Sequence, residues 1–78
     1  MRKKKKYVIL TFATTTAAMA TEKKCSSGQI PGRLIPLPGE ISAGCGLAWR
    51  MLPEEYECFR ERLMELGQEF QQIVELEL

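Results

Sequence analysis

The sequence predicts an α+β fold in which a four-stranded antiparallel sheet carries two helices on one face. Runs with strand and helix character follow one another along the 78 residues in the order β-α-β-β-α-β, and glycine and proline residues separate them. Because crossovers between parallel strands are right-handed, this order favours the ferredoxin-like arrangement. A chain of this length forms one domain, residues 1–78, with a single modest core.

The first strand and the first helix are predicted from the N-terminal third of the chain. Residues 7–12, YVILTF, are β-branched, aromatic or leucine, which suits a central strand. Thr14 or Thr15 can cap a helix that runs to about Ser27, where Gly28 is a stop signal. Small side chains on its inner face would let this helix lie close to the sheet. These are Ala17, Ala18, Thr21 and Cys25.

The same segment also imitates a secretory signal peptide. Basic residues 2–6 precede an apolar run, and Ala18-Met19-Ala20 resembles a cleavage site. The unbroken run spans only residues 7–10, however, and cleavage after Ala20 would remove the best strand of the chain. We therefore expect the strand and the helix. No segment approaches the roughly 20 apolar residues that a membrane span requires.

The remaining elements follow from turn residues and periodicity. Strands are predicted at residues 33–36, 46–51 and 70–78, and Pro36 closes the first of them because proline cannot donate to a ladder. A second helix begins at Pro53 and ends at Gly67. Its apolar residues recur at steps of three and four. They are Leu52, Tyr56, Phe59, Leu63 and Leu66.

Cys45 is the candidate reactive group. It lies between Gly44 and Gly46 in a proline-bounded loop, and glycine lets the backbone adopt unusual angles and turn amide N–H groups towards an anion. Ser42 and Arg50 are close to it in sequence and are predicted to help stabilise negative charge on sulfur. The alternative is a plain turn in which the cysteine fills a small gap, with Arg50 solvated or paired with a glutamate.

The predicted topology brings this loop to the start of the first helix. The first two strands run parallel, so both end at the same edge of the sheet. The Cys45 thiol would therefore lie near the positive end of a helix, beside the hydroxyls of Thr14 and Thr15. Helix N-termini lower the pKa of thiols and hold sulfur anions.

The other cysteines and the lack of histidine limit the chemistry. Cys25 is expected to fill space in the core, and Cys58 to be half exposed on the second helix. Three cysteines with no C-x-x-C pair and no histidine predict neither a disulfide framework nor a metal site. Reduced thiols favour the cytoplasm. Without histidine, Cys–His acyl transfer or hydrolysis is not expected.

Charge is unevenly distributed along the chain. Residues 1–50 hold nine Lys or Arg and two Glu, whereas residues 51–78 hold two Arg and eight Glu. The last strand should pair with the first, which would place Glu75 and Glu77 near residues 4–6 and stabilise the sheet modestly. An RNA-binding sheet would need several exposed aromatic residues. Trp49 shares its face with core residues, so no nucleic-acid partner is expected.

The segment from residue 30 to residue 50 resembles the selenium/sulfur (Se/S) carrier protein-like family, a short domain of unknown function. The positions that carry the resemblance are Ile30, Pro31, Leu34, Ile35, Pro36, Pro38, Ile41, Ser42, Cys45, Gly46, Ala48 and Arg50. The core pattern Pro-x-x-Ile-Ser-x-x-Cys-Gly is fairly specific. Residues 7–10 and 53–55 also fit, so the resemblance covers nearly the whole chain.

The resemblance implies a carrier rather than an enzyme. Cys45 would hold sulfur or selenium as a persulfide or selenopersulfide, taken from a donor protein and passed to an acceptor protein, with no other cofactor. The alternative is a non-catalytic binding or regulatory module that forms a homodimer through its open sheet face, including Ile9 and Ile35.

Overall fold

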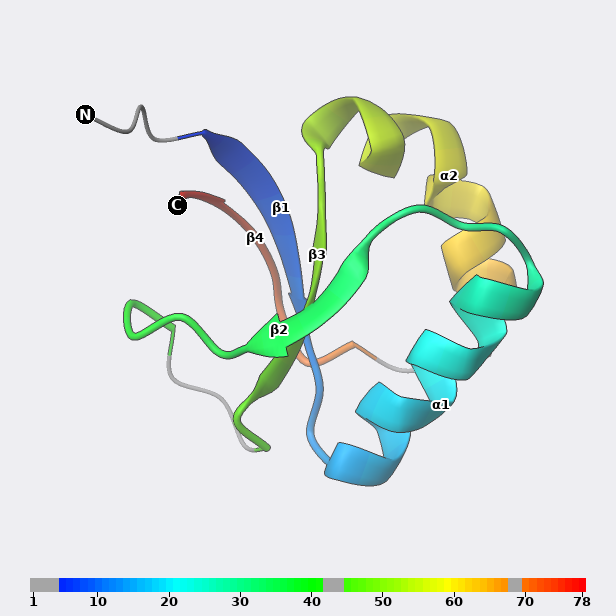
Figure 1. Cartoon of the computed structure of the whole chain (residues 1–78), viewed down its shortest axis with the longest axis horizontal. Coiled ribbons are helices and arrows are strands. Elements are labelled where there is room, and N and C mark those ends of the chain that lie inside the picture. Colours follow the sequence, from blue (N-terminus) through cyan, green and yellow to red (C-terminus); the bar gives the residue numbers. More distant parts are fainter. Residues whose placement is uncertain (1–4, 42–44, 68–69) are drawn as a thin grey trace.

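Four strands form one sheet, and both helices lie on the same face of it (Figure 1). The structure is a computed structural model that describes residues 5–41, 45–67 and 70–78. Its elements are β1 (Lys6–Thr11), α1 (Thr15–Ser27), β2 (Arg33–Pro36), β3 (Leu47–Met51), α2 (Pro53–Glu65) and β4 (Ile73–Glu77). The strand order is β2-β3-β1-β4, with every neighbouring pair antiparallel. The predicted ferredoxin-like fold is confirmed.

The main core lies between the helices and the sheet. Alternation along the strands sends Val8 and Leu10 of β1, and Trp49 and Met51 of β3, towards the helices. The inner face of α1 is as expected, with Ala18, Thr21 and Cys25 buried. Of the periodic residues of α2, Leu63 is fully buried and the others are half-buried.

The helix α2 is capped by Leu52, a residue whose side chain cannot accept a hydrogen bond. Leu52 precedes the helix in an extended conformation, and its side chain has no acceptor for a capping hydrogen bond. Instead, the Glu55 carboxylate accepts a hydrogen bond of 2.9 Å from the Leu52 backbone N–H, which is half of a capping box. Pro53 fits the first turn, where its missing N–H is not needed.

A second, smaller apolar cluster covers the face of the sheet that carries no helix. Ile41, in the connection between β2 and β3, packs there against Ile9 and Ala48. The turn that places it is closed by the Ile41 N–H, which donates to the Pro38 carbonyl at 3.0 Å. Ile9 is completely buried. The expectation of an open sheet face at Ile9 is therefore corrected, because the connection folds back over it.

The edge strand β4 pairs with β1 as the charge pattern predicted. Lys6 lies opposite Glu77, and its ammonium approaches the Glu75 carboxylate to 3.8 Å. Both side chains are more than half exposed, so the pair contributes little to stability. The Lys6–Glu75 pair is nevertheless consistent with the register between β1 and β4.

Candidate functional site

Cys45 lies at the end of the β2–β3 connection, two residues before β3 begins. Its side chain is half-buried and packs against the edge of the main core. The thiol Sγ donates a weak hydrogen bond to the Leu47 carbonyl, with an S···O distance of 3.6 Å. The thiol is therefore held by its own strand and still reaches solvent.

The residue after Cys45 requires a glycine backbone. Gly46 has a φ of 77°, a region that side chains other than glycine avoid. It is exposed, and a Cβ added there would meet no atom within 4 Å. Two other predicted site residues, Ser42 and Gly44, lie outside the described residues.

The first turn of α1 lies at the same end of the sheet as Cys45. Thr11, the last residue of β1, pairs with Ala48 near the beginning of β3. Thr14 and Cys45 each lie three residues beyond that pair, and Figure 1 shows the start of β3 and the start of α1 at the same end of the molecule. The topological part of the prediction is therefore confirmed.

Thr14 and Thr15 take different places at this helix start. Thr14 is the N-cap, and its Oγ1 accepts a hydrogen bond of 3.1 Å from the Ala17 N–H. Thr15 is the first helical residue, and both threonines are exposed. Because Thr14 satisfies one of the free amides itself, the remaining N–H groups of the first turn are left to attract an anion.

The structure does not bring Arg50 to the thiol. Arg50 lies at the other end of β3 from Cys45, and five strand residues span roughly 16 Å. Because the neighbouring Trp49 points to the core between helices and sheet, the Arg50 side chain points to the sheet face that carries no helix. There its guanidinium lies over the Tyr7 ring, 4.5 Å from the centroid. Its predicted role at the sulfur is therefore corrected on grounds of position.

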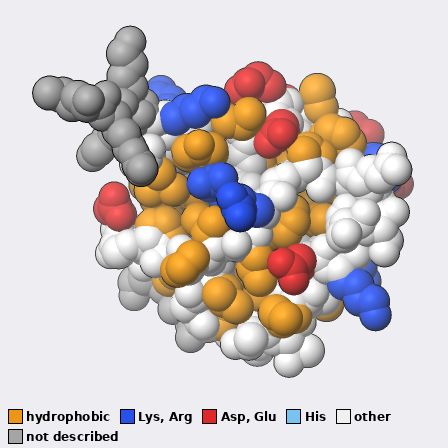
Figure 2. Space-filling model, in the orientation of Figure 1, with side chains coloured by type: hydrophobic (Ala, Val, Ile, Leu, Met, Phe, Trp, Pro, Cys, Tyr) orange, Lys and Arg blue, Asp and Glu red, His pale blue; other side chains and the backbone are white. Residues whose placement is uncertain are grey.

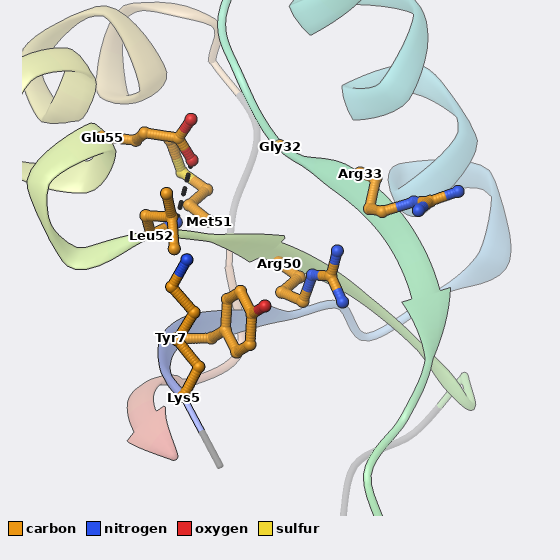
Figure 3. A pocket seen from close by; sticks show the side chains of 8 residues that line it. All are labelled: Lys5, Tyr7, Gly32, Arg33, Arg50, Met51, Leu52 and Glu55. Atoms are coloured by element: carbon orange, nitrogen blue, oxygen red, sulfur yellow. Dashed lines mark hydrogen bonds between the residues drawn. The ribbon is translucent and has the colours of Figure 1, made fainter. Parts of the chain in front are cut away.

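Arg50 lines a cavity of about 280 Å³ that the sequence analysis did not identify (Figure 3). Lys5 and Tyr7 at the start of β1 and Glu55 of α2 also line it, as does Arg33 of β2, whose guanidinium points away in Figure 3. Part of this cavity could have been predicted from the sequence, because strand alternation places Arg33 and Arg50 on the same face of the sheet. The sequence did not indicate that Lys5 would join them, since that depends on how β1 pairs with β3.

The other two cysteines differ from Cys45 in environment. Cys25 is completely buried in the main core, and desolvation raises the pKa of its thiol to about 11. It is therefore a neutral packing residue at neutral pH. Cys58 is exposed on the surface of α2, more than predicted. All three cysteines are free.

The described part of the chain contains neither a metal-binding cluster nor a helix that could span a membrane. Within residues 5–41, 45–67 and 70–78, no three His, Cys, Asp or Glu side chains are grouped so that they could hold a metal ion. In the same ranges, neither helix has the length and apolar character needed to cross a membrane.

Comparison with known proteins gives one match. The sequence model of a family described as "Putative Se/S carrier protein-like" matches residues 6–75. No curated protein and no solved structure matches the chain.

Proposed function

Because the chain belongs to the Se/S carrier protein-like family, we propose that it carries sulfur or selenium on Cys45 between a donor protein and an acceptor protein. The observation that carries this proposal is the contrast among its cysteines. Cys45 is the one that combines partial exposure to solvent, a following glycine with positive φ and a position at the same end of the sheet as the start of a helix.

The transfer needs no oxidant or reductant. The Cys45 thiolate attacks the outer sulfur of a donor persulfide, the donor's S–S bond breaks, and the donor leaves as a thiolate. Cys45 then holds the atom as a persulfide. An acceptor nucleophile attacks that outer sulfur, and Cys45 leaves as a thiolate. The same steps apply to a selenopersulfide. The proton that Sγ shares with the Leu47 carbonyl must leave first.

The surroundings of Cys45 fit an atom carried as an anion. A persulfide is longer than a thiol and needs free space beyond Sγ, which the exposed Gly46 leaves open. The exposed first turn of α1 supplies partial positive charge at this end of the sheet. The first feature leaves room for the carried atom, and the second supplies N–H donors at the same end of the sheet.

The chemistry of the protein is limited to holding and passing the atom. The chain contains no histidine, so no imidazole can act as general base beside Cys45. The partner proteins would therefore supply the proton transfers and the activation of sulfur or selenium. Three free thiols fit a reducing compartment such as the cytoplasm.

Persulfide loading tests the proposal. The protein is incubated with a cysteine desulfurase and cysteine, and its intact mass is measured without reductant. We expect one added sulfur atom on the unmodified protein and on Cys58→Ser, and none on Cys45→Ser. Loading of Cys45→Ser to the same extent would contradict the proposal, because the atom would then reside on another thiol.

A further inference from the structure

The cavity lined by Arg50 has a marked excess of positive charge. Lys5, Arg33 and Arg50 contribute three cations, and Glu55 the one carboxylate among the lining residues. That carboxylate accepts the Leu52 N–H at the start of α2, so part of its charge is already engaged. The cavity lies at the end of the sheet away from Cys45, so it is not part of the candidate site around that thiol.

Two of these cations are placed where they repel each other. Arg33 of β2 and Arg50 of β3 are direct cross-strand partners, and their side chains leave the same face of the sheet. Like charges in this position destabilise a sheet. Figure 3 shows that the two guanidinium groups turn apart. Within the described residues neither forms a salt bridge with a carboxylate.

Arg50 is held in place by a side-chain contact, and the other two cations are exposed. The Arg50 guanidinium lies on the Tyr7 ring at 4.5 Å, which fixes the plane of its donors. The backbone of Lys5 forms two hydrogen bonds with the backbone of Leu78, of 3.1 and 2.9 Å, so the Lys5 side chain leaves the sheet from a fixed point. Arg33 is exposed, so it can turn towards the cavity without displacing packed atoms. Figure 2 shows basic side chains surrounded by apolar surface on the viewed face.

We propose that this cavity binds a phosphate group, either free phosphate or the phosphate of a small metabolite. The planar fork of Arg50 matches two oxygens of a phosphate, Lys5 adds a compact positive charge, and the exposed Arg33 of the neighbouring strand β2 can turn in to add a third. A doubly charged oxyanion suits three cations and one carboxylate around the cavity better than a monovalent anion does. About 280 Å³ accommodates the group and part of what it is attached to.

Thermal unfolding with inorganic phosphate, compared with sodium chloride at equal ionic strength, tests the proposal. Phosphate should raise the Tm of the unmodified protein saturably, and chloride should not. Arg50→Gln should weaken phosphate binding about 10- to 100-fold, the effect of losing a charge-assisted contact. Lys23→Gln, which removes an exposed cation on α1, should retain the response. Equal responses in the two variants would overturn the proposal.

The Tm of an Arg33 variant gives a second test, because the expected change without phosphate is opposite to the change in the phosphate response. Without phosphate, Arg33→Gln should raise Tm, because it removes a like-charge neighbour of Arg50. With phosphate, the same variant should gain less Tm than the unmodified protein. Should Arg50→Gln alter folding by releasing Tyr7, the exposed Lys5→Gln gives the same test of binding. An undiminished phosphate response in both Arg33→Gln and Lys5→Gln would refute the site.

A comparison of probes separates the two sources of the phosphate group. Glycerol phosphate that binds at least as tightly as inorganic phosphate would support a phosphorylated metabolite. Weaker binding of glycerol phosphate would support the free ion. Absence of a saturable response to both compounds would overturn the proposal. Cys45→Ser should leave all these responses unchanged, so failure here is distinguishable from failure of the carrier role.

Discussion

At the scale of single residues, the three cysteines show how position decides what a thiol can do. Cys25 is enclosed by the core, Cys45 is half-buried just before the central strand β3, and Cys58 is exposed on a helix. Burial without a positive partner disfavours the thiolate, so Cys25 is excluded from sulfur transfer by its surroundings. The sequence indicated this difference correctly for Cys25, because its spacing from Ala18 and Thr21 places it on the inner stripe of α1.

The buried thiol of Cys25 predicts a loss of stability in alkali. Its pKa is raised from 9.0 to about 11 in the folded state, whereas the unfolded chain releases the proton near 9. Between these values the folded state binds more protons, so the free energy of unfolding falls as pH rises. The loss is at most about 2–3 kcal/mol, since each pKa unit corresponds to about 1.4 kcal/mol.

Urea unfolding of the unmodified protein and of Cys25→Ala from pH 8 to pH 11 measures this loss. The stability advantage of the unmodified protein should be constant below pH 9 and shrink above it. An advantage that stays constant to pH 11 would show that the thiol does not titrate as its burial requires.

At the scale of elements, the sequence predicted which segments form strands and helices better than it predicted how connections run. The helix α2 has a clear three- and four-residue periodicity, and its predicted start at Pro53 is confirmed. The last strand is shorter than predicted, Ile73–Glu77 in place of residues 70–78. The connection between β2 and β3 is rich in glycine and proline and has no periodicity, so nothing in its pattern showed that Ile41 returns to the sheet.

Three glycines predict three different responses to alanine. Gly32 has a φ of 127°, and an added Cβ would overlap the Trp49 indole and lie 2.7 Å from the Arg50 carbonyl oxygen. Gly32→Ala should therefore destabilise the fold by more than about 3 kcal/mol. Gly46 has a positive φ but free space, so its alanine variant should lose about 1 kcal/mol.

Gly39 is the matched control for these two variants. It has neither a positive φ nor an atom within 4 Å of an added Cβ. Gly39→Ala should be neutral or slightly stabilising, because alanine restricts the unfolded chain. Chemical denaturation of the three variants should give that order of stability. A Gly32→Ala protein as stable as Gly39→Ala would contradict the close packing of Trp49 against the backbone.

At the scale of the whole molecule, two sets of candidate functional residues lie at opposite ends of the sheet. Cys45 and the start of α1 lie at one end, and the cations around Arg50 lie at the other. From the sequence, Cys45 and Arg50 were expected to lie together because they are five residues apart. In an extended strand such a separation spans most of a small sheet, so proximity in sequence was misleading. Which residues lie together at each end of the sheet depends on the register between β1 and β3, and only the folded chain defines that register.

The second apolar cluster contains Ile41, which lies four residues before Cys45 in the sequence. Ile41 holds the β2–β3 connection against Ile9 and Ala48. Ile41→Ala should lower the free energy of unfolding by about 2 kcal/mol and accelerate alkylation of Cys45 by iodoacetamide several-fold, because the connection is no longer fixed. Ile41→Val, as the matched control, should lose about 1 kcal/mol and keep the slower rate. Identical alkylation rates in both variants would show that this cluster does not position the thiol.

The central claim is tested most directly by locating the transferred atom on the chain. The protein is incubated with a persulfide donor, alkylated and digested, and peptide mass spectrometry should find the extra sulfur on the fragment that contains Cys45. In a parallel sample, an acceptor thiol added before the alkylation should remove that sulfur. Extra sulfur found on the Cys25 or Cys58 fragment with Cys45 unmodified would contradict the account.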